Sequence, residues 1–437
     1  MSVLASVMIF YIADVITFDE GWHIIRVLLI LTRRHNLGEI IFVAKETVKG
    51  EARVAASPET VKKYIGLGYS VIVEKGAGLT SRIRDDEYKA AGAQISVSGN
   101  VAGQADIILK VRRPTQQEAG SYKRGSVVIA ILDPYGADED IIALAKAGVT
   151  GFSMEFMPRI TRAQSMDVLS SQANLAGYQA IIDAVEVYDR VIPMMMTAAG
   201  TVPAAKVFIM GAGVAGLQAI ATARRLGAIV TANDVRPAAK GQVASLGAKF
   251  IAVEDEEFRA AETTSGYAKE MSNEYQAKQT ALIADHISKQ DIVITTALIP
   301  GCPAPRLVSK EMLKSMQPGS IVVDLSVERG GNVEGTVANQ IVHVEGVKII
   351  GYTNAPSRIS GTASQLYARN LHAFLENMTD KETRKLAINF EDELVKATLL
   401  IHDNKVVHPA LAKVHAEKSP KSAGWAVDKT ENKKGGE

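Results

Sequence analysis

The sequence predicts an α/β protein with two Rossmann-like parallel-sheet domains, a cleft between them, and a first domain that is discontinuous. Short aliphatic and β-branched runs alternate with helical patterns from residue 40 to residue 355. The chain has 437 residues, 47% of them apolar, which suffices for two or three domains. The last elements follow a second sheet that is already complete, so we expect them to return to the first domain.

The composition indicates a soluble globular protein. The 49 basic and 48 acidic side chains nearly cancel, and no basic stripe is interleaved with aromatic residues, so we expect no nucleic-acid partner. The single cysteine, Cys302, excludes an internal disulfide and fits a reducing compartment. The eight histidines are scattered, so we expect no metal site.

Composition and patterning divide the chain into four segments. Residues 1–38 are an apolar N-terminal extension whose uncharged runs are shorter than the roughly 20 residues of a spanning helix. This extension is either a surface anchor or a translated upstream segment without function. Residues 39–170 plus 357–415 form the first α/β domain, and residues 171–356 form a Rossmann domain. Residues 416–437 are polar and rich in Lys and Gly, which predicts a disordered tail.

The first domain begins with a strand–helix–strand unit. A strand at 40–46 precedes a helix over 57–69, in which Ser57 is the N-cap and Pro58 the first helical residue. A parallel sheet is completed by strands at 70–78, 105–111, 125–132 and 149–156, with a helix near 138–147.

The second unit opens with the strand KVFIM and a glycine-rich turn. Its partner half contains strands in 290–301, 309–332 and 347–354. The helix over 361–378 and the strands that follow it, up to residue 410, are the elements expected to return to the first domain.

Gly211, Gly213 and Gly216 form G-x-G-x-x-G between a strand and a helix. The first glycine allows a tight turn, the second lets the backbone approach a pyrophosphate, and the third lets helix pack on strand. Asp234 lies 23 positions after Gly211, where an acid accepts both ribose hydroxyls and repels a 2′-phosphate. The loop therefore predicts NAD(H) binding, against the alternative of a close-packed turn without a ligand.

Four neighbouring residues complete this predicted nucleotide site. Arg236 either serves a 2′-phosphate, lies over the adenine or faces solvent. Val214 opens the helix after the loop, and Val235 follows the acid. Leu298 lies at a strand end that should emerge opposite the loop, at the carboxyl edge of the sheet.

A polar cluster precedes the second unit, in MPRITRAQSMDVLSSQ at 157–172. Thr161 and Gln164 have capping-box spacing, and on a helix Gln164, Asp167 and Ser170 would share one face. A capped, solvated helix start explains this pattern. The functional alternative is that Arg159, Gln164, Asp167 and Ser170 hold a nicotinamide, with the backbone of residues 160 and 161, Ile160 and Thr161, beside the nucleotide. Hydride transfer needs two rings held close without water, and no acid or base.

Several long blocks resemble the NAD(H)-binding component, domain I or alpha subunit, of proton-translocating NAD(P) transhydrogenase. They include PRITRAQSMDVLSSQANLAGYQA, MMMTAAGTVPAAKVFIMGAGVAGLQAIATARRLGA and PGSIVVDLSVERGGN, and the resemblance covers about residues 39 to 410. It places Arg159, Gln164 and Asp167 on the family's nicotinamide loop, with Ser170 beside it.

The resemblance also implies partners and a location. NADH would be bound by this chain, and NADP(H) would be the co-substrate on a separate component, with membrane subunits that couple the reaction to proton movement. The family further implies a homodimer in the cytoplasm, peripheral on the cytoplasmic face of the inner membrane. Because the chain stops before any membrane helices, it resembles the split form of the enzyme.

The polar segment 254–279 is too charged to pack and too long for a tight connection, which predicts a mobile lid. Gly266 would give it freedom, and the ring of Tyr267 would lie against the nucleotide, as the family's tyrosine does. The alternative is an ordinary solvated loop.

Two other functions compete with transhydrogenation. Alanine dehydrogenase shares the architecture, and it uses a Lys such as Lys110 and an Arg such as Arg53 for its substrate carboxylate. It also needs a catalytic His and Asp, where this chain reads AILDPYG and VERGG. A non-enzymatic NADH-sensing module is the other alternative.

Overall fold

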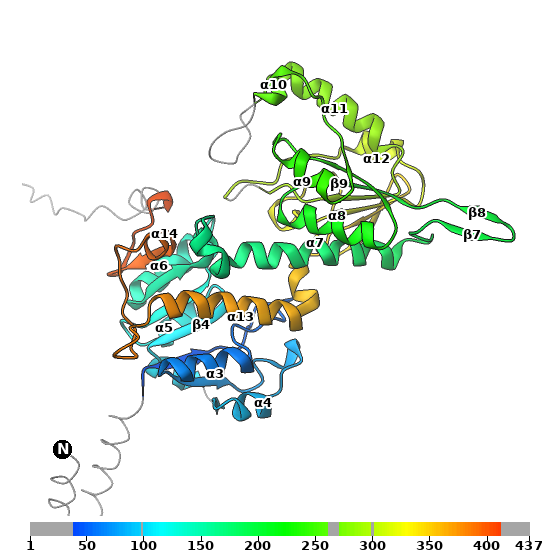
Figure 1. Ribbon diagram of the computed structural model, residues 1–437. Coiled ribbons are helices and arrows are strands. Elements are labelled where there is room, and N and C mark those ends of the chain that lie inside the picture. The colour runs from blue at the N-terminus through cyan, green and yellow to red at the C-terminus, as the bar shows by residue number, and fades with distance from the viewer. Residues whose placement is uncertain (1–37, 98, 261–270, 299–300, 412–437) are drawn as a thin grey trace, which may run out of the picture.

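The computed structural model describes residues 38–97, 99–260, 271–298 and 301–411 (Figure 1). The predicted N-terminal extension, apart from Gly38, and the predicted tail at 416–437 lie outside the described residues. The same is true of Gly266 and Tyr267, so the centre of the predicted lid has no structural account.

The first sheet has eight strands in the order β17-β16-β6-β5-β4-β1-β2-β3. Strands β1 to β6 pair in parallel, and their order is the 3-2-1-4-5-6 arrangement of Rossmann sheets. These strands are β1 (Ile40–Val43), β2 (Ser70–Glu74), β3 (Gln94–Ser96), β4 (Ile107–Arg112), β5 (Val127–Ile131) and β6 (Thr150–Ser153). The helices between them are α3 (Pro58–Leu67), α4 (Asp85–Ala90), α5 (Gln116–Ser121) and α6 (Asp138–Ala147). Ser57 caps α3 and Pro58 is its first residue, as predicted.

The C-terminal elements complete this first domain. Strand β16 (Leu399–His402) pairs antiparallel with β6, and β17 (Lys405–Val406) pairs with β16. Helix α13 (Ser360–Asn377) places Tyr367, Leu371 and Phe374 in the core of this sheet, and α14 (Glu393–Thr398) packs beside it. The prediction of a discontinuous first domain is therefore confirmed.

The second sheet has seven strands in the order β11-β10-β9-β12-β13-β15-β14. All pair in parallel except β14, which is antiparallel to β15. The strands are β9 (Lys206–Met210), β10 (Ile229–Asn233), β11 (Lys249–Phe250), β12 (Ile292–Thr295), β13 (Ile321–Asp324), β14 (Ile341–Val344) and β15 (Val347–Ile350). The helices are α8 (Val214–Arg225), α9 (Ala239–Ser245), α10 (Glu256–Arg259), α11 (Asn273–Ile287) and α12 (Lys310–Ser315). Two Rossmann-like sheets, the predicted fold class, are thus confirmed.

Alternate side chains of each strand enter separate cores on the two faces of each sheet. In β9, Val207 and Ile209 pack with residues of α8, whereas Phe208 and Met210 pack with residues of α11 and α12. The strands are apolar throughout because helices cover both faces of a parallel sheet. Such strands are nearly continuous in hydrophobicity, which is why they could be located in the sequence.

Helix α7 (Val168–Val187) belongs to both domains. Val168 lies in the core of the first sheet, while Ala180, Ile181 and Ala184 lie in the core of the second. Its 20 residues span roughly 30 Å, and Figure 1 shows it running from the first body along the base of the second. The boundary predicted between residues 170 and 171 falls in its first turn.

A two-stranded hairpin, β7 (Met195–Thr197) with β8 (Gly200–Val202), projects from the second body (Figure 1). Its side chains are exposed, including Met194 at 62% and Met196 at 80%. The sequence pattern did not predict this hairpin, because its three-residue strands carry no buried, alternating side chains.

The interpretation of 254–279 as too charged to pack is wrong at both ends of the segment. Asp255 caps α10 and Ser272 caps α11 through their side-chain oxygens. Phe258 and Tyr275 are 3% and 6% exposed and stack in parallel, with ring centroids 6.4 Å apart. Two aromatic residues, spaced so that each follows a cap, are enough to seat an otherwise polar segment.

Among the described residues, no helix has the length and apolar content to cross a membrane. No group of three or more His, Cys, Asp or Glu side chains is placed to hold a metal ion in the same portion of the chain.

The contact between α7 and α8 has no room for a side chain at Gly177. A Cβ there would lie 1.9 Å from the carbonyl oxygen of Ala215 in the first turn of α8. We expect Gly177→Ala to lower the free energy of unfolding by about 1–3 kcal/mol, because a backbone atom cannot move aside. Urea denaturation measures this change.

Gly241→Ala in α9 is the matched control, since a Cβ there meets nothing within 4 Å. That variant should be neutral or up to about 1 kcal/mol more stable, because alanine favours a helix. Equal stabilities for the two variants would contradict the close contact at Gly177.

Candidate functional site

The glycine loop joins β9 to α8 at the carboxyl edge of the second sheet. Gly211 has φ +104°, a left-handed conformation that favours glycine, and a Cβ on Gly216 would lie 1.8 Å from the carbonyl oxygen of Gly211. Gly213 is the N-cap of α8 and offers no side-chain cap, and a Cβ there would meet nothing within 4 Å. The amides of the first turn of α8 therefore face open space, as an anion-binding helix terminus requires.

A cavity of about 560 Å³ lies between this loop and the segment that leads into α7. The first-domain side contributes Pro158, Arg159, Ile160, Thr161, Ala163, Gln164, Asp167 and Ser170. The Rossmann side contributes Ala212, Gly213, Val214, Leu217, Arg236 and Gln242. A single cavity thus brings together the two motifs that the sequence singled out separately.

The remaining predicted residues lie around the cavity rather than in its lining. Gly211 and Gly216 shape the loop, and Asp234 is 7% exposed behind it. Val235 and Leu298 are 60% and 53% exposed and do not line the cavity.

Five lining residues were missed by sequence reasoning: Pro158, Ala163, Ala212, Leu217 and Gln242. Four of them are direct neighbours of predicted residues or of the glycines. Gln242 carried no signal, because only the packing of α9 beside α8 brings it to the loop.

The segment before α7 differs from the predicted helix start. Thr161–Met166 is a 3-10 helix whose N-cap is Ile160, and no side-chain cap is present, so the predicted capping box is wrong. Asp167 is instead the N-cap of α7, and its Oδ1 accepts from the amide of Ser170 at 2.8 Å. A carboxylate that accepts two donors from one residue, amide and hydroxyl, is a stronger cap than a threonine hydroxyl.

The 3-10 geometry nevertheless places the predicted polar side chains along one side. Residues three apart eclipse one another in a 3-10 helix, and the chain continues directly into α7. Gln164, Asp167 and Ser170 consequently all line the cavity. Arg159 and Gln164 are exposed, and neither has a side-chain hydrogen bond or ion pair with a residue that the structure describes, so both are available to a ligand.

Asp234 and Arg236 form a pair at the other end of the cavity. The carboxylate of Asp234 accepts from the amide of Ala212 at 2.8 Å and from Nε of Arg236 at 2.9 Å. A second guanidinium nitrogen contacts the other carboxylate oxygen at 3.0 Å, and these hydrogen bonds raise the pKa of Arg236. Asp234 thus supports the glycine loop and at the same time holds the only cation on the Rossmann side of the described lining.

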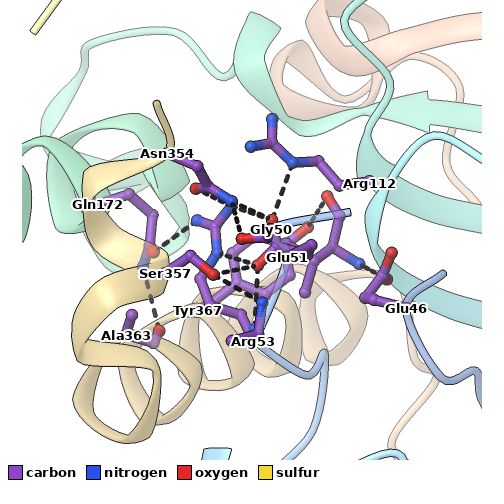
Figure 2. A network of polar contacts seen from close by, with 12 residues as sticks. Glu46, Gly50, Glu51, Arg53, Arg112, Gln172, Asn354, Ser357, Ala363 and Tyr367 are labelled. Atoms are coloured by element: carbon purple, nitrogen blue, oxygen red, sulfur yellow. Dashed lines mark hydrogen bonds and ion pairs between the residues drawn. The ribbon is translucent and has the colours of Figure 1, made fainter. Parts of the chain in front are cut away.

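A buried ionic network ties the first domain to both segments that cross between the domains (Figure 2). The guanidinium of Arg53 contacts both oxygens of Glu51, at 2.8 and 2.7 Å, and both side chains are buried. Arg53 also donates to Gln172 of α7 at 2.8 Å and to Asn354, at the start of the 3-10 helix Ala355–Ile359, at 3.1 Å. Arg112 donates to Glu51 at 2.9 Å.

Burial alone would raise the pKa of Glu51, but the hydrogen bonds and charges of Arg53, with the charge of Arg112, lower it to about 2. Glu51 is therefore ionised at neutral pH. The network holds α7 and the return segment in fixed places relative to the first sheet.

A Rossmann sheet whose glycine loop faces a second α/β domain across a cavity defines a two-domain dinucleotide-binding protein. The N-terminal domain family of alanine dehydrogenase/PNT matches residues 42–176, and the C-terminal domain family matches residues 180–409. The chain belongs to the alanine dehydrogenase/PNT family.

Individual relatives lie closer to one branch of that family. The first portion of a divided NAD(P) transhydrogenase subunit alpha, from Rhodospirillum rubrum, is 52% identical over 377 residues, which cover 85% of this chain and 98% of that protein. A crystal structure of transhydrogenase from Sinorhizobium meliloti has 64% identity and a TM-score of 0.78, covering 84% of this chain and 100% of that one. Alanine dehydrogenase of Methanococcus maripaludis is 31% identical over 385 residues, 86% of this chain and 96% of that protein.

Glu51→Gln should destabilise the protein by about 3–5 kcal/mol at pH 7, because it leaves the buried Arg53 without its counter-ion. The lowered pKa means that the contribution of Glu51 is present above pH 4.5 and lost as the pH falls through about 2. The stability difference between the native chain and the variant should shrink over that range, as measured by chemical denaturation.

Glu59→Gln is the control. Hydrogen bonds from Arg369 and Lys63 lower the pKa of Glu59 to about 2 as well, but its side chain is 44% exposed. Solvent screening limits its expected loss to about 1 kcal/mol. Similar losses for both variants would show that the buried network has no special weight.

Proposed function

We propose that this chain is the NAD(H)-binding subunit of a proton-translocating NAD(P) transhydrogenase. It exchanges hydride between NADH and NADP+ held on a separate partner component, while membrane subunits couple the reaction to proton movement. The observation that carries the proposal is the single cavity shared by the glycine loop and the polar 3-10 turn. The Rhodospirillum rubrum relative is named as one portion of a divided subunit alpha, which supports separate partner subunits. We place the chain in the cytoplasm, at the face of the inner membrane.

The cavity offers complementary groups for the two halves of a dinucleotide. The first turn of α8, entered through Gly213, suits the pyrophosphate, and Arg159 adds a positive charge across the cavity. Asp234 and Arg236 suit the adenosine ribose. Gln164, Asp167 and Ser170 suit the carboxamide and ribose of the nicotinamide, which supplies the hydride.

The roles of these side chains are binding and orientation. Asp167 keeps Ser170 in place through its amide and hydroxyl, while the amide of Gln164 is unpaired among the described residues. Fixed placement of the reacting ring and exclusion of water are what the reaction requires from the protein.

Four observations weigh against alanine dehydrogenase activity. Arg53 is saturated by Glu51, Gln172 and Asn354, and Lys110 is buried against Glu118 at 2.7 Å. Neither cation is free for a substrate carboxylate. Where the catalytic His and Asp are expected, Asp133 forms an ion pair with Arg329, and Glu328 lies 4.0 Å from Arg112. These pairs join the two domains instead of activating a substrate.

The exposed hairpin supports a homodimer. Met194, Met195 and Met196 project from the body at 62%, 44% and 80% exposure, next to Val191 at 39%. A contiguous apolar projection of this kind is typical of an interface, and methionine side chains adapt to the partner surface. We infer that a second copy covers it.

The native chain should bind NADH more tightly than NADPH, because Asp234 repels a 2′-phosphate and holds Arg236. Asp234→Ala should weaken NADH binding by about 1–3 kcal/mol and strengthen NADPH binding relative to NADH, since it frees the guanidinium. Fluorescence titration of both nucleotides measures this. In the double variant Asp234→Ala/Arg236→Ala the relative gain for NADPH should disappear, and equal or tighter NADPH binding by the native chain would contradict the assignment.

Hydride transfer should require the separate NADP-binding component, and Gln164→Ala or Asp167→Asn should slow it by about tenfold or more with NADH affinity nearly unchanged. Stopped-flow transfer and titration measure the two quantities. Gln116→Ala, in an exposed residue paired with Asp140 far from the cavity, is the control and should change neither.

The same assay separates the alternatives. Alanine-dependent reduction of NAD+ by the chain alone would indicate an alanine dehydrogenase. NADH binding without transfer to the cognate partner would favour a sensing module.

A further inference from the structure

Asn370 is a buried amide of α13 that lies beside the 3-10 turn without entering the cavity. It is 7% exposed. Its Nδ2 donates to the carbonyl oxygen of Ser165 at 2.8 Å, and its Oδ1 accepts from Oγ of Ser171 at 2.7 Å. Because a carbonyl oxygen only accepts, the amide nitrogen must face Ser165, which fixes the orientation of the side chain.

The two partners of Asn370 flank the bend at Asp167. Ser165 belongs to the 3-10 helix and Ser171 to the first turn of α7. Between them the backbone of Asp167 is extended, with φ −75° and ψ 92°, so the two helices meet at an angle. Ser165 is the neighbour of Gln164, and Ser171 is the neighbour of Ser170, so the amide bridges the two halves of the polar cluster.

Other contacts hold the turn less specifically. Ala163 and Met166 pack into the first core, but apolar packing does not fix a direction. Arg162 pairs with Asp392 on α14, yet its side chain is 48% exposed and solvent weakens the pair. The cap formed by Asp167 and Ser170 lies within α7 and does not constrain the 3-10 helix.

The bridge also continues into the buried ionic network. Oγ of Ser171 accepts from Nε2 of Gln172 at 3.3 Å, and Oε1 of Gln172 accepts from Arg53 at 2.8 Å. Asn370 therefore connects the turn to the same polar chain that holds α7 in place.

We propose that Asn370 is a positioning residue for hydride transfer, acting through Ser165 and Ser171 to set Gln164 in register with Asp167 and Ser170. The role rests on the proposed function. Since transfer depends on placement at the scale of a fraction of an ångström, a small change in this bend slows the reaction while the glycine loop still binds the adenosine half.

The test uses Asn370→Asp in the full chain with its NADP-binding partner. The variant keeps the shape but replaces the donor toward Ser165 with an oxygen, which repels the carbonyl. We expect transfer to slow by about tenfold or more, with the Kd for NADH and for ADP each within about threefold of the native values. Ser171→Ala, which removes one hydroxyl, should slow transfer in the same way but less, and the double variant should lose less than the product of the two effects.

Arg369→Ala is the matched control, one position away on α13. Its side chain is 51% exposed and pairs with Glu59, so transfer should be unchanged. Native rates in both Asn370→Asp and Ser171→Ala would overturn the role of Asn370 alone, as would parallel losses of rate, ADP affinity and melting temperature. If the native chain transferred no hydride to its partner, the proposed function would fail first. Should Asn370→Asp not fold, Ser171→Ala decides by the same split between rate and affinity.

Discussion

The close contact of α7 with the first turn of α8 determines how the rest of the site is arranged. At Gly177 the two helices approach so closely that a Cβ would overlap the carbonyl of Ala215. One end of α7 carries Asp167 and Ser170, and the start of α8 is the glycine loop. The two walls of the cavity therefore belong to helices that touch directly, and their separation depends on a backbone contact that no flexible side chain can adjust.

A second constraint acts where the chain crosses between the domains. The pair formed by Glu51 and Arg53 reaches α7 through Gln172 and the return segment through Asn354. Buried charges are costly unless every donor and acceptor is matched, so such a network tolerates one arrangement far better than others. The ion pair of Asp133 with Arg329 adds a link between the domains at the sheet edges. The cavity is thus bounded by two bodies held in register at several points.

The same architecture serves different chemistry in the two branches of the family. In this chain the cations at Arg53 and Lys110 are neutralised internally by carboxylates, and the residues that face one another across the domains are ion pairs. The polar groups left free among the described residues, such as Arg159 and Gln164, gather at the cavity instead. A fold of this kind limits where chemistry occurs, whereas the identity and pairing of a few side chains decide which chemistry it is.

The sequence alone determined the fold class, most strands, the glycine loop and the polar cluster at 159–170, because these rest on local rules: hydrophobic periodicity, N-caps and the backbone freedom of glycine. Tertiary structure decided that the turn before α7 is a 3-10 helix capped by Asp167, and that Arg236 lies on Asp234. It also decided that Gln242 reaches the cavity and that Asn370 braces the turn from about 200 positions further along the chain. These features depend on contacts between residues far apart in sequence, where packing selects one partner among many that local patterning treats as equivalent.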